Sequence, residues 1–228
     1  MKKVIRTPEE RFENLEDYPF QSHYIQVEDD LRLHYLDEGN PNNPTVLLLH
    51  GEPSWSYLYR KMIPILSNKF RVIAPDLIGF GKSDKLVNNA DYSYQQHIDW
   101  LTTFIEQLDL QKMILFCQDW GGLLGLRIIT LMENRFDMVI ASNTTLPIGN
   151  IPMPDSFMQW RNFSQNSPDF SIGKVIDIGT VKPLSEEVKE AYNAPFPSED
   201  YKAGARIFPT LVPIKADDPE CIKNMRAW

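Results

Sequence analysis

Four short apolar runs, separated by stretches with helical periodicity, restrict the possible folds of this sequence more than any other feature. Turn-forming residues border each run, and the runs occupy residues 45–49, 71–74, 113–117 and 138–141. Continuous apolar runs of this length are typical of strands buried on both faces of a parallel sheet. Between them lie helical patterns, such as residues 94–108, with apolar side chains at three- and four-residue spacing. The alternation predicts a doubly wound, mostly parallel sheet with right-handed crossovers.

The segments before and after these runs have different patterns. Residues 23–29 and 31–37 alternate apolar and polar side chains, which is typical of half-buried strands joined by a tight turn. We therefore expect the sheet to open with an antiparallel pair. From about residue 150 the strand patterns end, and prolines, aromatic residues and helix formers prevail. Because 228 residues suffice for two such units, we expect an α/β core over residues 1–149 and a helical cap over residues 150–228.

Charge and cysteine usage narrow the possible partners. The formal net charge of −8 argues against non-specific binding to nucleic acid or to an anionic membrane surface. No segment approaches the length of a membrane span, and the basic residues 1–6 lead into acidic and polar residues instead of the apolar stretch of a signal peptide. Cys117 and Cys221 fit neither a disulfide framework nor a zinc site. The sequence predicts a cytoplasmic protein that binds a small molecule, without a nucleic-acid or membrane partner.

Residues 118–122, Gln-Asp-Trp-Gly-Gly, stand between the apolar run 113–117 and a helical pattern. A strand, a nucleophilic residue and glycines that begin a helix are typical of the sharp turn called a nucleophile elbow. Serine is the usual nucleophile, whereas this chain has Asp119. A carboxylate can attack an alkyl carbon without a base and form an ester, provided that the leaving group departs as a stable anion. The alternative is that Asp119 only caps the following helix.

A second motif, His-Gly-Glu-Pro-Ser-Trp at residues 50–55, follows the run 45–49 directly. This is where hydrolases with such an elbow place the loop of the oxyanion hole. We expect the backbone N–H groups of Glu52 and Trp120 to face Asp119, where they would hold its carboxylate and stabilise the charge formed when water attacks the ester. The alternative is a purely structural turn. His50 is expected to support this loop, and Asp76 to brace a nearby turn.

Several segments resemble haloalkane dehalogenases, and together they extend over nearly the whole chain. They are residues 49–62, 74–84, 116–122, 192–197 and 201–206. Glu52 suggests the subfamily that has Glu, not Asn, at this position. The resemblance implies an α/β-hydrolase fold with a helical cap. It also implies hydrolysis of a carbon–halogen bond to an alcohol and a halide through an alkyl ester of Asp119. A haloalkane and water would be the only reactants, without a cofactor or a metal.

The resemblance also assigns the halide site. A halide is a large, weakly basic anion, and neutral N–H donors in a dry pocket can stabilise it and still release it. Trp120 resembles one halide-binding tryptophan of the family, and Trp160 resembles the second, which comes from the cap. The alternative is that each indole only packs. An epoxide hydrolase would instead use cap tyrosines, for which Tyr192 and Tyr201 are the candidates.

Two further alternatives remain. A hydrolase-fold binding protein would bind a ligand without forming an ester. A fluoroacetate-type dehalogenase would have Arg in place of Trp120.

The second half of the family's reaction needs a histidine, held by an acid, that activates water. In α/β-hydrolases both residues follow the nucleophile, whereas the four histidines here, at positions 23, 34, 50 and 97, all precede Asp119. We therefore expect the C-terminal strands, the acid and the histidine to be missing, as in a fragment of a longer enzyme rather than a genuine truncated product. The run 138–141 would then form an exposed apolar edge. A protein of only these residues is expected to be poorly stable and unable to turn over.

Overall fold

The computed structural model describes residues 2–227, which form a central six-stranded sheet and eight α-helices. The strand order is β2-β3-β5-β4-β7-β8, in which β2 and β3 form the predicted antiparallel opening and β3 also runs antiparallel to β5. The remaining neighbours are parallel, so the predicted mostly parallel sheet is confirmed. The strands are β2 (His23–Glu28), β3 (Leu31–Glu38), β4 (Thr45–Leu49), β5 (Arg71–Pro75), β7 (Met113–Gln118) and β8 (Phe136–Ser142).

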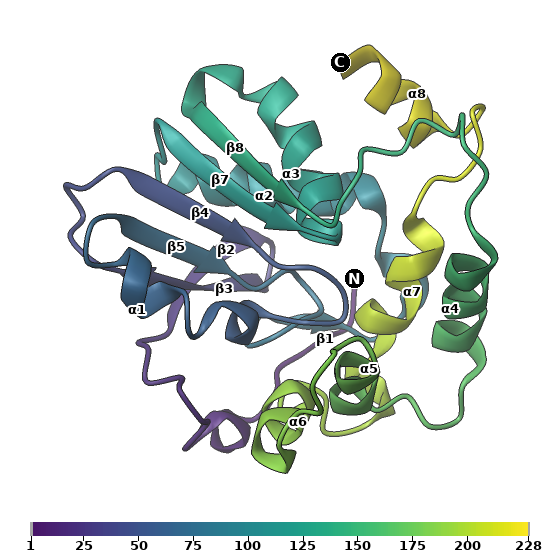
Figure 1. Ribbon diagram of the computed structural model, residues 1–228, viewed down its shortest axis with the longest axis horizontal. Helices are drawn as coiled ribbons and strands as arrows, with labels where there is room; N and C mark the ends of the chain where they lie inside the picture. Colours follow the sequence, from purple (N-terminus) through teal and green to yellow (C-terminus); the bar gives the residue numbers. More distant parts are fainter. Residues whose placement is uncertain (1, 228) are drawn as a thin grey trace.

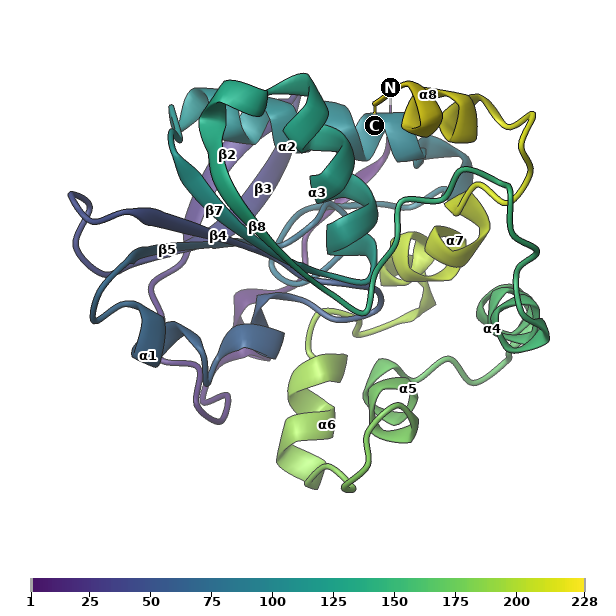
Figure 2. The same ribbon diagram turned by 45° about the horizontal axis from the view of Figure 1, so that its top comes forward.

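Helices cover both faces of this sheet. In Figure 2, α2 and α3 lie on one face and α1 lies on the other. Their bounds are α1 (Ile63–Leu66), α2 (Tyr94–Gln107) and α3 (Trp120–Leu131). A separate small sheet pairs β1 (Val4–Ile5) with β6 (Lys85–Leu86). Five short 3₁₀ helices are η1 (Glu9–Phe12), η2 (Ser56–Tyr59), η3 (Asn89–Asp91), η4 (Glu133–Arg135) and η5 (Glu199–Tyr201).

Strand β8 corrects one expectation from the sequence. The run 138–141 forms a strand as predicted, but it is not buried on both faces, since Met138 is 56% and Ile140 is 46% exposed. All five residues of β4, in contrast, are buried. The reason is position in the sheet: β8 pairs with β7 along one edge, and no described strand pairs with its other edge. β8 is therefore the exposed apolar edge that we expected for a sheet without further strands.

Four helices lie together beyond the carboxyl ends of β4, β7 and β8, whose arrowheads point toward them in Figure 1. They are α4 (Asp155–Asn166), α5 (Ile172–Ile178), α6 (Glu186–Asn193) and α7 (Ala203–Leu211). Helix α8 (Pro219–Ala227) lies apart from them and contacts α3, where Arg127 Nε donates to Asn224 Oδ1 at 2.7 Å. The division at residues 149 and 150 stays a prediction. None of the described helices is both long and apolar enough to cross a membrane.

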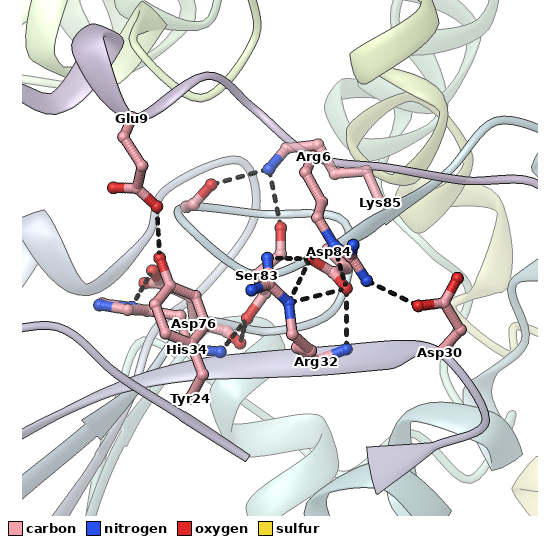
Figure 3. A network of polar contacts seen from close by, with 11 residues as sticks. Arg6, Glu9, Tyr24, Asp30, Arg32, His34, Asp76, Ser83, Asp84 and Lys85 are labelled. Carbon is pink, nitrogen blue, oxygen red and sulfur yellow. Dashed lines mark hydrogen bonds and ion pairs between the residues drawn. The ribbon is translucent and has the colours of Figure 1, made fainter. Parts of the chain in front are cut away.

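A buried polar network holds the loop between β5 and β6 against the sheet (Figure 3). Asp76 accepts hydrogen bonds from the backbone N–H groups of Ser56 at 2.7 Å and Lys82 at 2.8 Å, and it contacts His34 Nδ1 at 2.7 Å. Burial alone would raise the pKa of Asp76, but the His34 ring and the N–H donors lower it to about 2. Asp76 therefore braces this turn, as expected from the sequence, and it also ties down the start of η2.

Candidate active site

Asp119 stands in a strained turn between the end of β7 and the start of α3. Its backbone has φ 51° and ψ −123°, a conformation that is costly for a residue with a side chain. Neighbouring glycines permit the turn. A Cβ atom on Gly121 would lie 2.1 Å from the carbonyl oxygen of Leu49, and one on Gly122 would lie 2.0 Å from Thr144 Oγ1. The sequence Asp-Trp-Gly-Gly therefore folds into an elbow because only hydrogen fits where the helix meets the strands.

The Asp119 carboxylate points toward the loop after β4 instead of capping α3. Its side chain makes no capping hydrogen bond to that helix. Asp119 Oδ1 instead accepts a hydrogen bond of 2.7 Å from the backbone N–H of Glu52. A Cβ atom on Gly51 would lie only 2.4 Å from Asp119 Cβ, so glycine is needed for the loop to come this close. The geometry therefore disfavours the alternative in which Asp119 only caps α3.

The two carboxyl groups of the site differ in protonation. Burial raises the pKa of Asp119, but the nearby backbone N–H groups of Glu52 and Trp120 oppose this rise. Burial raises the pKa of Glu52 well above its ordinary value, and the neighbouring charge of Asp119 raises it further, while a hydrogen bond from Trp160 opposes both. Glu52 Oε1 is also inaccessible and has no hydrogen-bond partner among the described residues. The pKa of Glu52 is therefore raised more strongly than that of Asp119, so Asp119 is the more readily ionised of the two carboxyl groups.

A cavity of about 190 Å³ adjoins Asp119. The structure brings both candidate tryptophans to its wall, Trp120 from α3 and Trp160 from α4. Glu52 completes the set of four residues singled out in the sequence. The other lining residues are mostly apolar or small and uncharged: Leu123, Asn143, Thr144, Thr145, Met153, Phe157, Pro209 and Val212. An adjoining cavity of about 820 Å³ shares Glu52 and Trp160 with the first. The carboxylate thus faces a small cavity that no cationic side chain lines.

None of the four histidines lines either of these two cavities. His50 is fixed in a supporting role, since its Nδ1 donates to the Gly51 carbonyl oxygen and its Nε2 accepts from the Leu77 N–H, both at 2.9 Å. Burial lowers the pKa of His50, so the ring is neutral. As expected from the sequence, His50 holds the loop that carries Glu52.

The candidate tyrosines of an epoxide hydrolase are absent from the wall of the cavity at Asp119. Tyr192 is buried and packs edge-on against the Tyr57 ring, with centroids 5.2 Å apart. Tyr201 on η5 lines neither of the cavities near the nucleophile. Neither of these two candidate tyrosines is therefore placed at Asp119 to activate an epoxide oxygen.

Sequence reasoning missed Thr144, which follows β8. Its hydroxyl donates to the Asp119 carbonyl oxygen at 2.7 Å, while the Asn143 carbonyl oxygen accepts from the Asp119 N–H at 3.3 Å. A signal was available, because the carboxyl ends of neighbouring parallel strands lie at the same edge of a sheet.

Within residues 2–227 no group of three or more potential metal ligands is found.

Comparison with known proteins agrees with this geometry. The family model described as alpha/beta hydrolase fold matches residues 44–171. The haloalkane dehalogenase of Psychrobacter cryohalolentis is 54% identical over 231 residues, which cover 99% of this chain and 76% of that protein. That of Mycolicibacterium paratuberculosis is 49% identical, with coverage of 99% and 76%.

A solved structure is also similar. The haloalkane dehalogenase DpaA of Paraglaciecola agarilytica, described as tetrameric, superimposes with a TM-score of 0.92 at 41% identity, over 99% of this chain and 77% of that one. The chain thus spans about three quarters of the length of its relatives. With this identity and coverage, the chain belongs to the haloalkane dehalogenases, hydrolytic enzymes of the α/β-hydrolase fold.

Proposed function

We propose that Asp119 is the nucleophile of this dehalogenase. A carboxylate oxygen attacks the carbon that bears the halogen, a carbon–oxygen bond forms, and the carbon–halogen bond breaks so that its electron pair leaves with the halide. The observation that carries this proposal is the position of one charged carboxylate on the same small cavity as two indoles. The backbone N–H groups of Glu52 and Trp120 orient the carboxylate. They do not neutralise it as a cation would.

The halide that forms is stabilised by Trp120 and Trp160. Indole N–H groups are neutral donors, and in a mostly apolar cavity they stabilise a developing anion more effectively than they would in water. A lysine or arginine would bind the product more tightly and slow its release. The raised pKa of Glu52 also favours this step, because it opposes a second negative charge at the cavity wall, which would repel the leaving halide.

We further propose that a protein of these 228 residues stops at the ester. Hydrolysis requires a base that takes a proton from water, and no described histidine lines the cavities around Asp119. In this proposal the backbone N–H groups of Glu52 and Trp120 would stabilise the oxyanion of that second step, but they cannot accept a proton. One halide per chain should therefore be released.

The test is to mix the protein with excess 1,2-dibromoethane and count the bromide released per chain. We expect a burst of at most one equivalent, and none from Asp119→Asn. Release over many equivalents would contradict the proposed stop at the ester. Styrene oxide in place of the bromoalkane tests the epoxide-hydrolase reading, and we expect no alkylation with it.

We also infer a cytoplasmic location. Cys117 and Cys221 support this inference, since both are buried free thiols. Recovery of the native protein with a disulfide would argue against it.

A further inference from the structure

Helix α7 inserts one phenyl ring into the core behind the active site. Phe208 is 0% exposed and contacts three aromatic rings. Its ring centroid lies 4.4 Å from that of Trp120, 4.5 Å from that of His97 and 4.7 Å from that of Phe80. Through Phe208, helix α7 therefore contacts the Trp120 side chain, which we propose to bind the halide.

Phe208 does not line the cavity next to Asp119, although Pro209 and Val212 do. Its ring meets the Trp120 indole at an interplanar angle of 47°. Tyr94 of α2 also packs on the indole, with centroids 5.5 Å apart at 50°. Trp120 thus contacts two rings from different helices, and such contacts restrict rotation about its side-chain torsions.

The surroundings of Phe208 hold it in place. His97 meets it edge-on at 88°. Burial lowers the pKa of His97 to about 3, so this ring is uncharged and acts as an aromatic wall. The α7 backbone is also close to the core, because a Cβ atom on Gly204 would lie 3.1 Å from the Cα of Gly79. A displacement of α7 would therefore move Phe208 away from Trp120.

We propose that Phe208 is a positioning residue that holds the Trp120 indole in the orientation from which its N–H donates to the halide. The affinity for halide then depends on the position of helix α7. This inference rests on the proposed role of Trp120. The indole N–H must point at one place in a cavity of about 190 Å³. In enzymes, a misplacement of about 1 Å caused by a distant substitution can cost roughly 100-fold in rate.

The test compares Phe208→Leu with Phe104→Leu. Phe104 is also 0% exposed, but its ring packs on Tyr35, away from the cavity, so this variant controls for the general cost of a smaller buried side chain. The bromide dissociation constant is measured by quenching of tryptophan fluorescence, and urea unfolding reports the stability of each variant. We expect Phe208→Leu to raise the bromide dissociation constant about tenfold and Phe104→Leu to leave it unchanged.

Phe208→Met keeps much of the side-chain volume but lacks a flat ring. It replaces Phe208→Leu in the test if the leucine variant does not fold. It should also weaken bromide binding. Equal bromide affinity in the Phe208 and Phe104 variants would overturn the inference. Trp120→Phe separates this result from a failure of the proposed function. If that variant binds bromide as well as the unchanged protein, the halide role of Trp120 fails and the inference fails with it.

Discussion

At the scale of single residues, Asp119 and Glu52 illustrate how surroundings assign different roles to two carboxyl groups. Two backbone N–H groups stabilise the ionised form of Asp119. Glu52 is buried with fewer hydrogen-bond donors around its carboxyl group, and it lies next to the charge of Asp119, so its neutral form is favoured. Enzymes with paired carboxyl groups separate an acid from a base in this way. Here the separation concentrates the charge on the proposed nucleophile.

The pH dependence of halide release should report the difference between the pKa values of Asp119 and Glu52. Because the pKa of Asp119 is raised, the bromide burst should slow as the pH falls, with a midpoint above the ordinary aspartate value of about 3.9. Protonation removes the nucleophile, so activity lies on the alkaline side of that midpoint. Glu52→Gln keeps the backbone N–H and should leave the midpoint unchanged, since the strongly raised pKa of Glu52 disfavours a charge on that side chain. A midpoint that falls in Glu52→Gln would mean that Glu52 carries a charge.

The sequence predicted which residues meet at the site but not their protonation. The motifs around Asp119 and Glu52 lie at the ends of predicted strands, so their proximity followed from the parallel sheet. The pKa values depend on burial and on Trp160, which comes from a distant helix. Phe208 could not be found for the same reason, because its contacts with Trp120 and His97 join segments with no local pattern in common.

At the scale of elements, the apolar runs predicted the parallel strands to within one or two residues at each end. Strong periodicity and bordering turns explain this success. Helix α3 starts at Trp120 and includes Gly121 and Gly122, whereas the helical pattern of the sequence begins only after these two glycines. Gly121 and Gly122 carry no helical signal of their own, since glycine disfavours helix interiors. Close packing against β4 and the segment after β8 holds them in the helix.

The elbow provides a prediction at this scale. Gly122→Ala places a Cβ atom 2.0 Å from Thr144 Oγ1, so the segment after β8 must move. We expect a loss of about 1–3 kcal/mol in the free energy of unfolding, together with a weaker bromide burst. Gly179→Ala is the matched control. Its Cβ atom would meet nothing closer than 3.4 Å, so its stability should hardly change. Equal stability of the two variants in urea unfolding would refute the packing explanation.

At the scale of the whole molecule, the arrangement in Figure 1 puts the helices α4 to α7 over the carboxyl ends of the strands. This layout brings Trp160 to the cavity that contains Asp119. The sequence indicated a helical region after residue 150, but helical patterns do not specify how helices pack on a sheet. The exposure of β8 depended likewise on which strands lie beside it, which no pattern within the run 138–141 encodes.

The β8 edge leads to a prediction about association. An apolar strand with a free edge is a template for pairing with another chain. We expect a protein of these residues to self-associate with increasing concentration, and Met138→Lys to reduce this association, because Met138 is 56% exposed on that strand. Val181→Lys is the control, since Val181 is fully exposed but lies outside any strand. Sedimentation velocity would contradict the role of the edge if both variants associate equally.

The most direct test of the central claim is mass spectrometry of the protein after reaction with 1,2-dibromoethane. We expect one bromoethyl group per chain, located by peptide mapping as an ester on Asp119 and absent from Asp119→Asn. Bromide released without any ester on Asp119, or an ester on another carboxyl group such as Glu52, would contradict the assignment of the nucleophile.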